Sequence, residues 1–424
     1  MQKDDLLRLL RDPNLIPSNK QTLLLSIADQ AASMDMPCYL VGGFVRDLLL
    51  NKPVNDLDII VGGDAIKLGK ALVKKFGGKL TTHQKFHTAI WHPSTSPRGS
   101  LIPNTSTPDT IDLITARSET YEHPGALPTI KPATIEDDLR RRDFTINAMA
   151  IRLDGDHFGE LFDPLGGQND LEQKLIRILH PHSFIDDPTR IFRALRYEHR
   201  YAFNLEPATF NLISPESLAV LSKLSGERIR HELDLIFDEE NAGKMVLRVV
   251  NLKVSNVVHS ALPLFNLRYS DFLEMDPALD IPASRATIGY MLWLMDLSED
   301  EILSIAKRLD FTSDLTHSVW AVSQLKKSLP FLVNSKPSVW AFALEKLPLL
   351  SIYAVYLVTR ENALLDYLSI WRHIKPHITG DDLIARGLQP GPRFGEILSQ
   401  LRAAWLDGVV KDKDQENELL NTLL

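Results

Sequence analysis

Residues 38–58 read Cys-Tyr-Leu-Val-Gly-Gly-Phe-Val-Arg-Asp-Leu-Leu-Leu-Asn-Lys-Pro-Val-Asn-Asp-Leu-Asp, an apolar run that enters the glycine pair Gly42-Gly43. This order predicts a strand that ends where a short helix begins. Glycines at such a junction let the backbone approach a phosphate closely, and the start of the helix offers free N–H donors. Arg46, one turn into the helix, adds a charged donor. The stretch therefore predicts a phosphate site, although a glycine pair alone also fits a plain tight turn.

Two carboxylates close the same stretch, with one residue between them. Asp56 and Asp58 would face the same side of a strand, where they repel each other unless cations lie between them. Mg²⁺ accepts such oxygen ligands and keeps positions free for phosphate. Asp112, in the apolar segment 110–115, is expected to be a third carboxylate of a two-metal site on a neighbouring strand. We predict Asp56 and Asp58 as metal ligands and all three aspartates as catalytic. The alternatives are a solvated loop pair and an exposed strand residue.

The composition is that of an ordinary soluble protein with more than one domain. The chain has 424 residues, of which 44% are hydrophobic and 24% charged, and a single core rarely grows beyond about 300 residues. The net charge of −8 argues mildly against a nucleic-acid partner, but phosphate binding depends on local basic patches. The one cysteine, Cys38, is expected to be a buried core thiol. No apolar signal region or membrane-length stretch is present, so a cytoplasmic protein is predicted.

The pattern along the chain predicts an α/β part followed by a long helical part. Residues 1–36 are expected to be a helical lead-in, and nearly everything after about residue 166 is expected to be helical. Residues 93–108, rich in Ser, Thr, Pro and Asn, indicate a hairpin loop that is a surface insertion without a known role. Between these parts we expect a helix over 64–76 and strands over 38–41, 57–61, 89–92, 110–115, 148–153 and 159–162.

A second charged segment, residues 138–148, contains three consecutive arginines. Three neighbours in sequence cannot share one face, so one or two of them are expected to turn inward. Asp143 is expected to orient an arginine, and Asn147 to bond a ribose or a backbone group. The alternative is a solvated basic run.

A third segment, residues 186–197, joins a carboxylate to a stripe of arginines. Asp187 precedes Pro188 and resembles a helix N-cap, while Arg190 lies three residues on and Arg193 and Arg196 continue the stripe. Such a pair can read a base edge, because the carboxylate accepts from the exocyclic amine of cytosine or adenine and the guanidinium donates to the ring nitrogen. Uracil and guanine reverse both polarities, and each good paired contact discriminates by ~1–3 kcal/mol. The alternative is a capped helix with a solvated basic face.

Together these segments resemble the class II tRNA nucleotidyltransferases, that is, the CCA-adding enzymes and their bacterial poly(A) polymerase relatives. The segments that resemble the motifs of this family, in its order, are 41–47 with 56–58, then 141–148, 163–177, 186–190 and 225–229. The resemblance is weaker in the C-terminal half, where 378–383 and 387–392 carry it. The fourth motif normally begins with Glu, and Asp186 departs from it.

The resemblance implies an α+β protein with a polymerase-beta-like nucleotidyltransferase head (37–165), a neck (166–240) for base recognition, and an all-α body (241–360) and tail (361–424) that hold tRNA. It implies Mg²⁺ at Asp56 and Asp58, and a flexible loop, linked to the switch from C to A addition, that starts at 117–121. The residues that we predict to bind the nucleotide are Gly42, Gly43, Arg46, Arg142, Asn147, Asp187, Arg190, Arg193 and Arg196.

The function expected from these residues is addition of C, C and A to tRNA 3′ ends from CTP and ATP, with release of pyrophosphate. Relatives that add only C-C or only A, or that make poly(A), share the chemistry and remain alternatives. A basic Gly-Arg-Arg-Phe-like sequence, which tends to accompany poly(A) synthesis, is not found, and this favours tRNA. A non-catalytic RNA-binding module is less expected, and no histidine is followed by Asp, as a metal-dependent phosphohydrolase domain would need.

Overall fold

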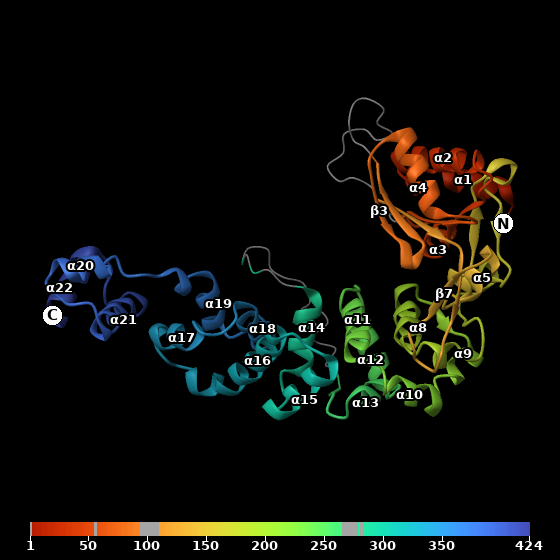
Figure 1. Cartoon of the computed structure of the whole chain (residues 1–424). Helices are drawn as coiled ribbons and strands as arrows, with labels where there is room; N and C mark the ends of the chain where they lie inside the picture. The colour runs from red at the N-terminus through yellow and green to blue at the C-terminus, as the bar shows by residue number, and fades with distance from the viewer. Residues whose placement is uncertain (1, 55–56, 94–109, 265–278, 280, 282–283) are drawn as a thin grey trace. The chain divides into compact units, whose positions relative to one another are not determined.

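The computed structural model describes residues 2–54, 57–93, 110–264, 279, 281 and 284–424. The chain divides into two compact units, Met1–Leu224 and Ser225–Leu424 (Figure 1). The division falls inside the segment 166–240 that the resemblance assigns to a neck. The first unit holds the sheet and the second is built from helices, so the predicted fold class, an α/β head followed by helices, is confirmed.

The first unit is organised around a seven-stranded sheet with the order β3-β4-β5-β2-β1-β8-β9. The pair of β2 with β5 is parallel, and the other neighbours in this sheet are antiparallel. Two small sheets lie beside it, an antiparallel β6–β7 hairpin and a parallel β10–β11 pair. The strands are β1 (Cys38–Val41), β2 (Leu57–Val61), β3 (Lys79–His83), β4 (Thr88–His92), β5 (Ile111–Thr115), β6 (Arg117–Thr120), β7 (Thr129–Pro132), β8 (Ala150–Arg152), β9 (Leu161–Phe162), β10 (Leu175–Ile176) and β11 (Asn204–Leu205).

Helix α4 covers β3, β4 and β5. It begins at Asp64, whose carboxylate accepts the Ile66 and Lys67 N–H groups, and it ends at Gly77, whose φ is 76°. The helices of this unit are α1 (Lys3–Arg11), α2 (Ser18–Ala32), α3 (Gly43–Leu49), α4 (Ala65–Phe76), α5 (Ile135–Arg140), α6 (Gly167–Glu172), α7 (Ser183–Asp186), α8 (Thr189–Arg200), α9 (Pro207–Asn211) and α10 (Pro215–Leu221), with 3-10 turns η1 (Gln84–Phe86), η2 (Thr145–Asn147) and η3 (Gly155–His157).

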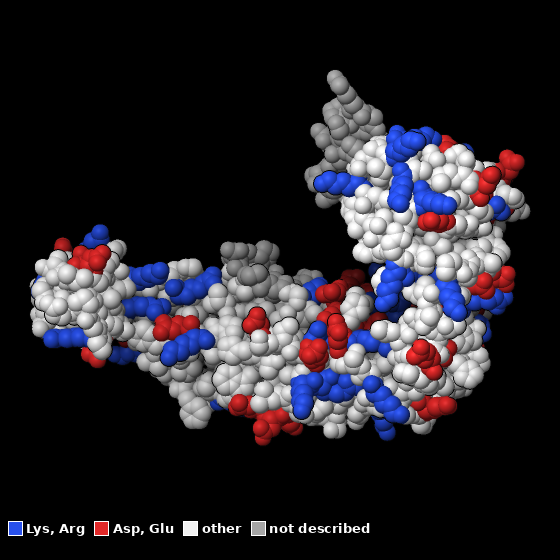
Figure 2. Space-filling model, viewed as in Figure 1, with Lys and Arg blue, Asp and Glu red and all other residues white. Residues whose placement is uncertain are grey.

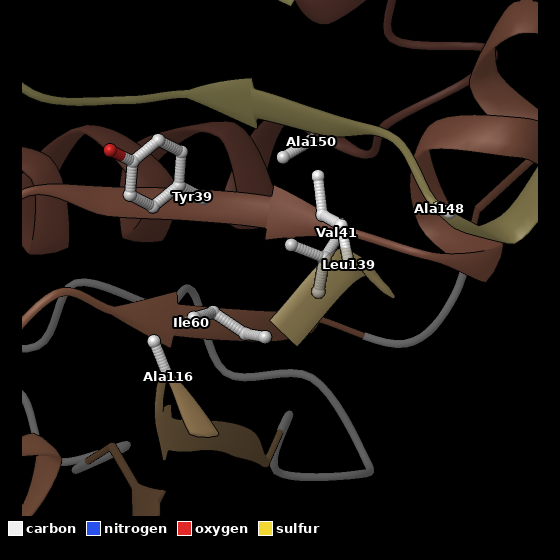
Figure 3. Close-up of a cluster of buried hydrophobic side chains, with 7 residues drawn as sticks. All are labelled: Tyr39, Val41, Ile60, Ala116, Leu139, Ala148 and Ala150. Atoms are coloured by element: carbon white, nitrogen blue, oxygen red, sulfur yellow. The ribbon is translucent and has the colours of Figure 1, made fainter. Parts of the chain in front are cut away.

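Strand β1, which lies between β2 and β8, is buried on both faces. Cys38 and Leu40 are fully buried on one face, and burial raises the pKa of the Cys38 thiol to about 12, so the predicted core thiol is confirmed. Tyr39 and Val41 belong to a cluster on the other face, whose strand members lie side by side on β1, β2 and β8 (Figure 3). The cluster consists of Tyr39, Val41, Ile60, Ala116, Leu139, Ala148 and Ala150. Because Ile60 lies in this cluster, Asp58, two residues earlier in β2, faces the same side of the sheet.

The segment after the sheet is locked to η2 by a buried carboxylate. Asp170 of α6 accepts a 2.6 Å hydrogen bond from Thr145 Oγ1 and a 3.0 Å bond from Arg177 Nε. Asp163 caps α6 by accepting the N–H groups of Gly167 and Gln168 at 2.7 and 2.9 Å. Gly167 lies directly against the Thr145 carbonyl, where a Cβ would overlap that oxygen.

The second unit is helical, and its last three helices pack around Leu383, Ile397, Leu401 and Leu420. Within the described ranges, no helix is both long and apolar enough to cross a membrane. The helices are α11 (Gly226–Phe237), α12 (Ala242–Asn251), α13 (Val254–Val258), α14 (Arg285–Leu294), α15 (Glu299–Leu309), α16 (Ser313–Leu332), α17 (Pro337–Leu344), α18 (Leu349–Thr359), α19 (Asn362–Ser369), α20 (Gly380–Ala385), α21 (Pro392–Leu406) and α22 (Lys413–Leu423), with a 3-10 turn η6 (Trp371–His373).

Two predictions about secondary structure need correction. Strands do not stop at residue 166, because β10 pairs with β11, and the sequence pattern missed β3, β6 and β7. The reason for β3 is that four of its five residues are exposed and show no apolar alternation. Apart from Pro93, the predicted hairpin loop 93–108 lies outside the described residues. The flanking strands β4 and β5 do pair antiparallel.

We expect Gly167→Ala to lower the free energy of unfolding of the first unit by about 2–3 kcal/mol, because the new methyl group must displace the backbone of η2. Urea unfolding of the full chain measures the effect. Gly395→Ala is the matched control, since Gly395 lies in α21 with no atom within 4 Å of an added Cβ. The control should change stability by less than about 1 kcal/mol. Equal stability of Gly167→Ala and wild type would contradict the close approach.

Candidate active site

Two carboxylates lie opposite each other on the parallel pair of strands β2 and β5. The register of β2 and β5 aligns Asp58 with Asp112, so their side chains project from the same face about one strand spacing apart. Asp58 is exposed and Asp112 half-buried. Asp56, the other predicted metal ligand, lies outside the described residues. The structure thus brings together two of the three predicted catalytic aspartates.

The glycine turn lies at the same end of the sheet as the carboxylates. Because β1 and β2 run antiparallel, the carboxyl end of β1, where Gly42 and Gly43 follow, is beside the amino end of β2, where Asp58 stands. Gly42 has a φ of 64°, and a Cβ there would overlap the guanidinium of Arg142. Only glycine fits this position, since both the backbone angle and the neighbouring arginine exclude a side chain.

Arg46 of α3 is almost fully buried and is held on several sides. Its Nε and Nη2 donate to the two Asp47 oxygens at 2.9 and 2.8 Å, and its Nη1 donates to Asn147 Oδ1. The guanidinium carbon lies 4.7 Å from the ring centroid of Tyr201 and 5.4 Å from that of Tyr197. These two rings come from the end of α8, so Arg46 joins the glycine turn to that helix.

Asp143 completes the connection. Its Oδ2 accepts 2.8 and 2.6 Å bonds from Nε and Nη2 of Arg193, and its Oδ1 accepts a 2.8 Å bond from Asn147 Nδ2. Burial alone would raise the pKa of Asp143, but Arg193, Asn147 and Arg190 outweigh it and lower the pKa to about 2. The prediction that Asp143 orients an arginine is confirmed. A continuous network, which we call the Asp143 network, runs through Arg46, Asn147, Asp143 and Arg193.

The three consecutive arginines divide as the sequence suggested. Arg140 stays exposed and pairs with Glu136, whereas Arg141 and Arg142 turn inward to Asp138, a fully buried carboxylate. Asp138 accepts a 2.9 Å hydrogen bond from Arg141 Nε and a 3.1 Å hydrogen bond from Arg142 Nη2. The Nε of Arg142 is buried with no hydrogen-bond partner among the described residues. Asp138 therefore holds the Arg142 guanidinium at Gly42 while one of its donors stays unused.

The predicted base-reading pair is held by its immediate neighbours. Arg190 donates from Nη1 to Ser183 Oγ at 2.7 Å and from Nη2 to the Arg141 carbonyl at 2.9 Å. Asp187 Oδ1 accepts from the Thr189 hydroxyl at 2.7 Å and from the Thr189 N–H at 3.2 Å, but the N-cap residue of α8 is Pro188, so the resemblance of Asp187 to an N-cap is corrected. Arg196 is buried with its guanidinium 5.6 Å from the Tyr197 ring. Arg190 bonds the carbonyl of Arg141, and the next residue, Arg142, lies at the glycine turn. The base-reading pair is therefore connected to that turn.

Sequence reasoning missed several of the residues that hold this site together. Asp138 lies three and four residues before Arg141 and Arg142, a helical spacing that does signal a pair. Tyr197 and Tyr201 also have helical spacing. Ser183 carries no such local signal, because a break between α7 and α8 separates it from Arg190.

Comparison with known proteins identifies the family. Residues 38–177 match the model of the poly A polymerase head domain. An A-adding tRNA nucleotidyltransferase from Halalkalibacterium halodurans is 33% identical over 92% of this chain and 90% of its own length. The chain belongs to the tRNA nucleotidyltransferase family. A second A-adding relative, from Geobacter sulfurreducens, is 32% identical over 95% of this chain, which spans 47% of the length of that relative.

Other members of the family that resemble this chain carry different names. A CC-adding tRNA nucleotidyltransferase from Deinococcus radiodurans is 29% identical over 94% of this chain and 93% of its own, and a CCA-adding enzyme from Leuconostoc citreum is 27% identical over 91% and 92%. A solved CCA-adding enzyme in an apo form is 29% identical, with a TM-score of 0.84 over 100% of this chain and 99% of its own. The Thermotoga maritima CCA-adding enzyme, solved in complex with tRNA, is 28% identical, with a TM-score of 0.78 over 99% and 98%.

We expect Asp143→Asn to lower the free energy of unfolding by about 2 kcal/mol at pH 7. The pKa of this carboxyl is lower in the folded protein, about 2, than its ordinary 3.8, so its stabilisation is present above pH 4. The contribution is lost as the pH falls from about 4 to 2, and the difference between variant and wild type should close over that range. Chemical unfolding at a series of pH values measures it. Asp156→Asn, at an exposed aspartate, is the control. A difference that does not depend on pH would contradict the ion pair.

Proposed function

We propose that this tRNA nucleotidyltransferase adds C, C and A to tRNA 3′ ends from CTP and ATP. The observation that carries the proposal is the linkage of two sites: the Asp187–Arg190 pair is joined through Arg141 to the arginine that lies at the glycine turn. A base reader connected to a phosphate-binding turn suits an enzyme that selects nucleotides without a nucleic-acid template.

The reaction needs the nucleotide triphosphate held in a fixed position. The tRNA 3′ hydroxyl would attack the α-phosphate, forming the new O–P bond while the bond to the β-phosphate breaks and pyrophosphate leaves. Gly42 and Gly43 provide backbone without side chains, and Arg46 and Arg142 bring positive charge beside them. The unused, buried Nε of Arg142 suits a donor that awaits a phosphate or sugar oxygen.

The carboxylates fit a magnesium site. Asp58 and Asp112 present oxygen donors from adjacent strands on one face, which is the donor set that Mg²⁺ prefers, and we propose that Asp56 joins them. Magnesium bound there would offset the negative charge that develops on the reacting phosphate. In the protein itself, the parallel register of β2 and β5 keeps the two carboxylates together at the end of the sheet that also carries the glycine turn.

The choice between bases would follow from Asp187 and Arg190. Asp187 would accept from the exocyclic amine and Arg190 would donate to the ring nitrogen of cytosine or adenine, whereas uracil and guanine would leave both groups mispaired. The hydrogen-bond partners of Arg190, the Ser183 hydroxyl and the Arg141 carbonyl, are neutral oxygens, and its positive charge also helps to lower the pKa of Asp143.

We propose that the helical second unit holds tRNA by its backbone. On the face shown in Figure 2, Lys and Arg side chains are interspersed with Asp and Glu over α17–α22, and residues 337–423 hold nine basic and eleven acidic residues. Phosphate binding depends on where individual basic side chains lie rather than on the net charge. The Thermotoga maritima CCA-adding enzyme, solved in complex with tRNA, supports tRNA as the partner of this chain.

A second candidate is addition of the terminal A alone. The relatives from Halalkalibacterium and Geobacter, both more than 30% identical over more than 90% of this chain, are named A-adding. The β6–β7 hairpin, whose first strand begins the segment that resembles the flexible loop, is also present. Glu119 of β6 accepts a 2.7 Å hydrogen bond from Arg141 Nη1 and a 3.2 Å hydrogen bond from the Tyr121 hydroxyl. The hairpin therefore contacts Arg141, the same arginine that the base-reading pair contacts. This hairpin is compatible with both full CCA addition and A addition.

One assay separates the candidates. Labelled CTP and ATP are offered separately and together to tRNAs that end at the discriminator base, at C and at C-C, with Mg²⁺ present. We expect C to be added to the first two substrates and A to the third. Incorporation of A alone, only on the C-C substrate, would replace the proposal by the second candidate. Long A tails would indicate a poly(A) polymerase, and incorporation of neither nucleotide would refute the family activity for this chain.

We expect Asp58→Asn and Asp112→Asn each to lower kcat at least about 100-fold, because each removes a charged oxygen ligand from the proposed metal site. Initial rates over a range of Mg²⁺ concentrations measure the loss. Asp156→Asn, at an exposed aspartate remote in sequence from both strands, should keep wild-type rates. Wild-type rates in the two strand variants would remove the carboxylates from the mechanism.

A further inference from the structure

Ser183 touches both members of the base-reading pair. It is fully buried in α7, its hydroxyl accepts the 2.7 Å bond from Arg190 Nη1, and its carbonyl accepts the Asp187 N–H at 3.2 Å. Arg190 is the site residue that this hydroxyl contacts. The Ser183 side chain therefore holds the Arg190 guanidinium, and the Ser183 backbone carbonyl holds the Asp187 N–H.

The guanidinium is held at two points. Nη1 binds Ser183 and Nη2 binds the Arg141 carbonyl at 2.9 Å. Because the five donors of a guanidinium lie in one rigid plane, two anchored nitrogens restrict the rotation of the whole group. With the Ser183 bond removed, a single anchor remains and the plane is free to turn about it.

The carboxylate has its own anchor. The Thr189 hydroxyl donates to Asp187 Oδ1 at 2.7 Å, and Thr189 is itself buried at the start of α8. This hydrogen bond fixes Oδ1 of Asp187 and thereby sets the direction of the other carboxylate oxygen. Ser183 and Thr189 thus each contribute one hydroxyl to one half of the pair, and the Thr189 N–H adds a 3.2 Å hydrogen bond to the same Asp187 oxygen.

We propose that Ser183 and Thr189 are positioning residues that set the base specificity of this enzyme. The inference rests on the proposed function, in which Asp187 and Arg190 read the incoming base. Discrimination against uracil and guanine depends on polar groups that stay in place when the wrong base arrives, so that they are left mispaired. A pair that can rotate would instead adapt to the reversed polarity of uracil and guanine. The kcat/KM for UTP and GTP would then rise relative to that for CTP and ATP.

The test compares Ser183→Ala and Thr189→Val with wild type in the full chain. The measured quantity is kcat/KM for CTP and ATP divided by kcat/KM for UTP and GTP, on tRNAs at the matching stage of addition. We expect this ratio to fall about tenfold in each variant, because each loses one hydrogen bond to a charged group. Ser183→Thr, which keeps a hydroxyl, should recover much of the ratio.

Ser323→Ala is the matched control. Ser323 is also fully buried in a helix, and its hydroxyl donates to the Leu297 carbonyl at 2.7 Å in the second unit. This variant loses the same atom at the same burial and should keep the wild-type ratio. A sample that is partly unfolded lowers all four rates equally and leaves the ratio unchanged, so a structural role alone cannot reproduce the expected result.

The outcomes separate this inference from the proposed function. If wild type discriminates and both variants keep its ratio within twofold, Ser183 and Thr189 do not position the pair, and the inference fails alone. If Ser183→Ala does not fold, Thr189→Val and Ser183→Thr decide the question by the same ratio. If wild type incorporates no nucleotide, or all four equally, the proposed function fails and takes the inference with it.

Discussion

The buried carboxylate of Asp143 is the interaction on which the arrangement of the site depends. It receives the guanidinium of Arg193 from α8 and the amide of Asn147 from η2, and the same amide receives Arg46 from the glycine turn. Three segments that lie far apart in the sequence, around residues 46, 147 and 193, thus meet at Asp143 or at the amide bound to it. Because a buried charge without partners is very costly, each segment is held in place by the requirement that Asp143 stay paired.

The site collects many positive charges, and the protein compensates most of them locally. Arg46 has Asp47, Arg193 has Asp143, and Arg141 and Arg142 share the buried Asp138. Arg190 differs, because its two hydrogen bonds go to neutral oxygens. The arginines that shape the site thus pair directly with carboxylates, whereas Arg190 makes its hydrogen bonds to neutral oxygens and acts on Asp143 through its charge.

Much of the fold followed from local sequence, and the site followed in part. The strands β1 and β2 are apolar runs and were predicted to the residue, and the helix predicted over 64–76 runs over Ala65–Phe76 with Asp64 as its cap. Local periodicity carries no information on partners far apart, however, so the pairing of Asp143 with Arg193, 50 residues on, was not specified beyond "an arginine". The two-residue strands β10 and β11 are too short to show a period, and Ser183 was missed because its role depends on a turn between helices.

Gly42 and Arg142 together have a consequence for how this chain can vary. The space in which a Cβ at position 42 would stand is filled by the guanidinium of a residue one hundred positions later. The two positions therefore occupy one volume, and neither can be considered alone. A substitution at 42 would require the arginine to leave, which would also abandon Asp138. The two positions thus constrain each other through excluded volume.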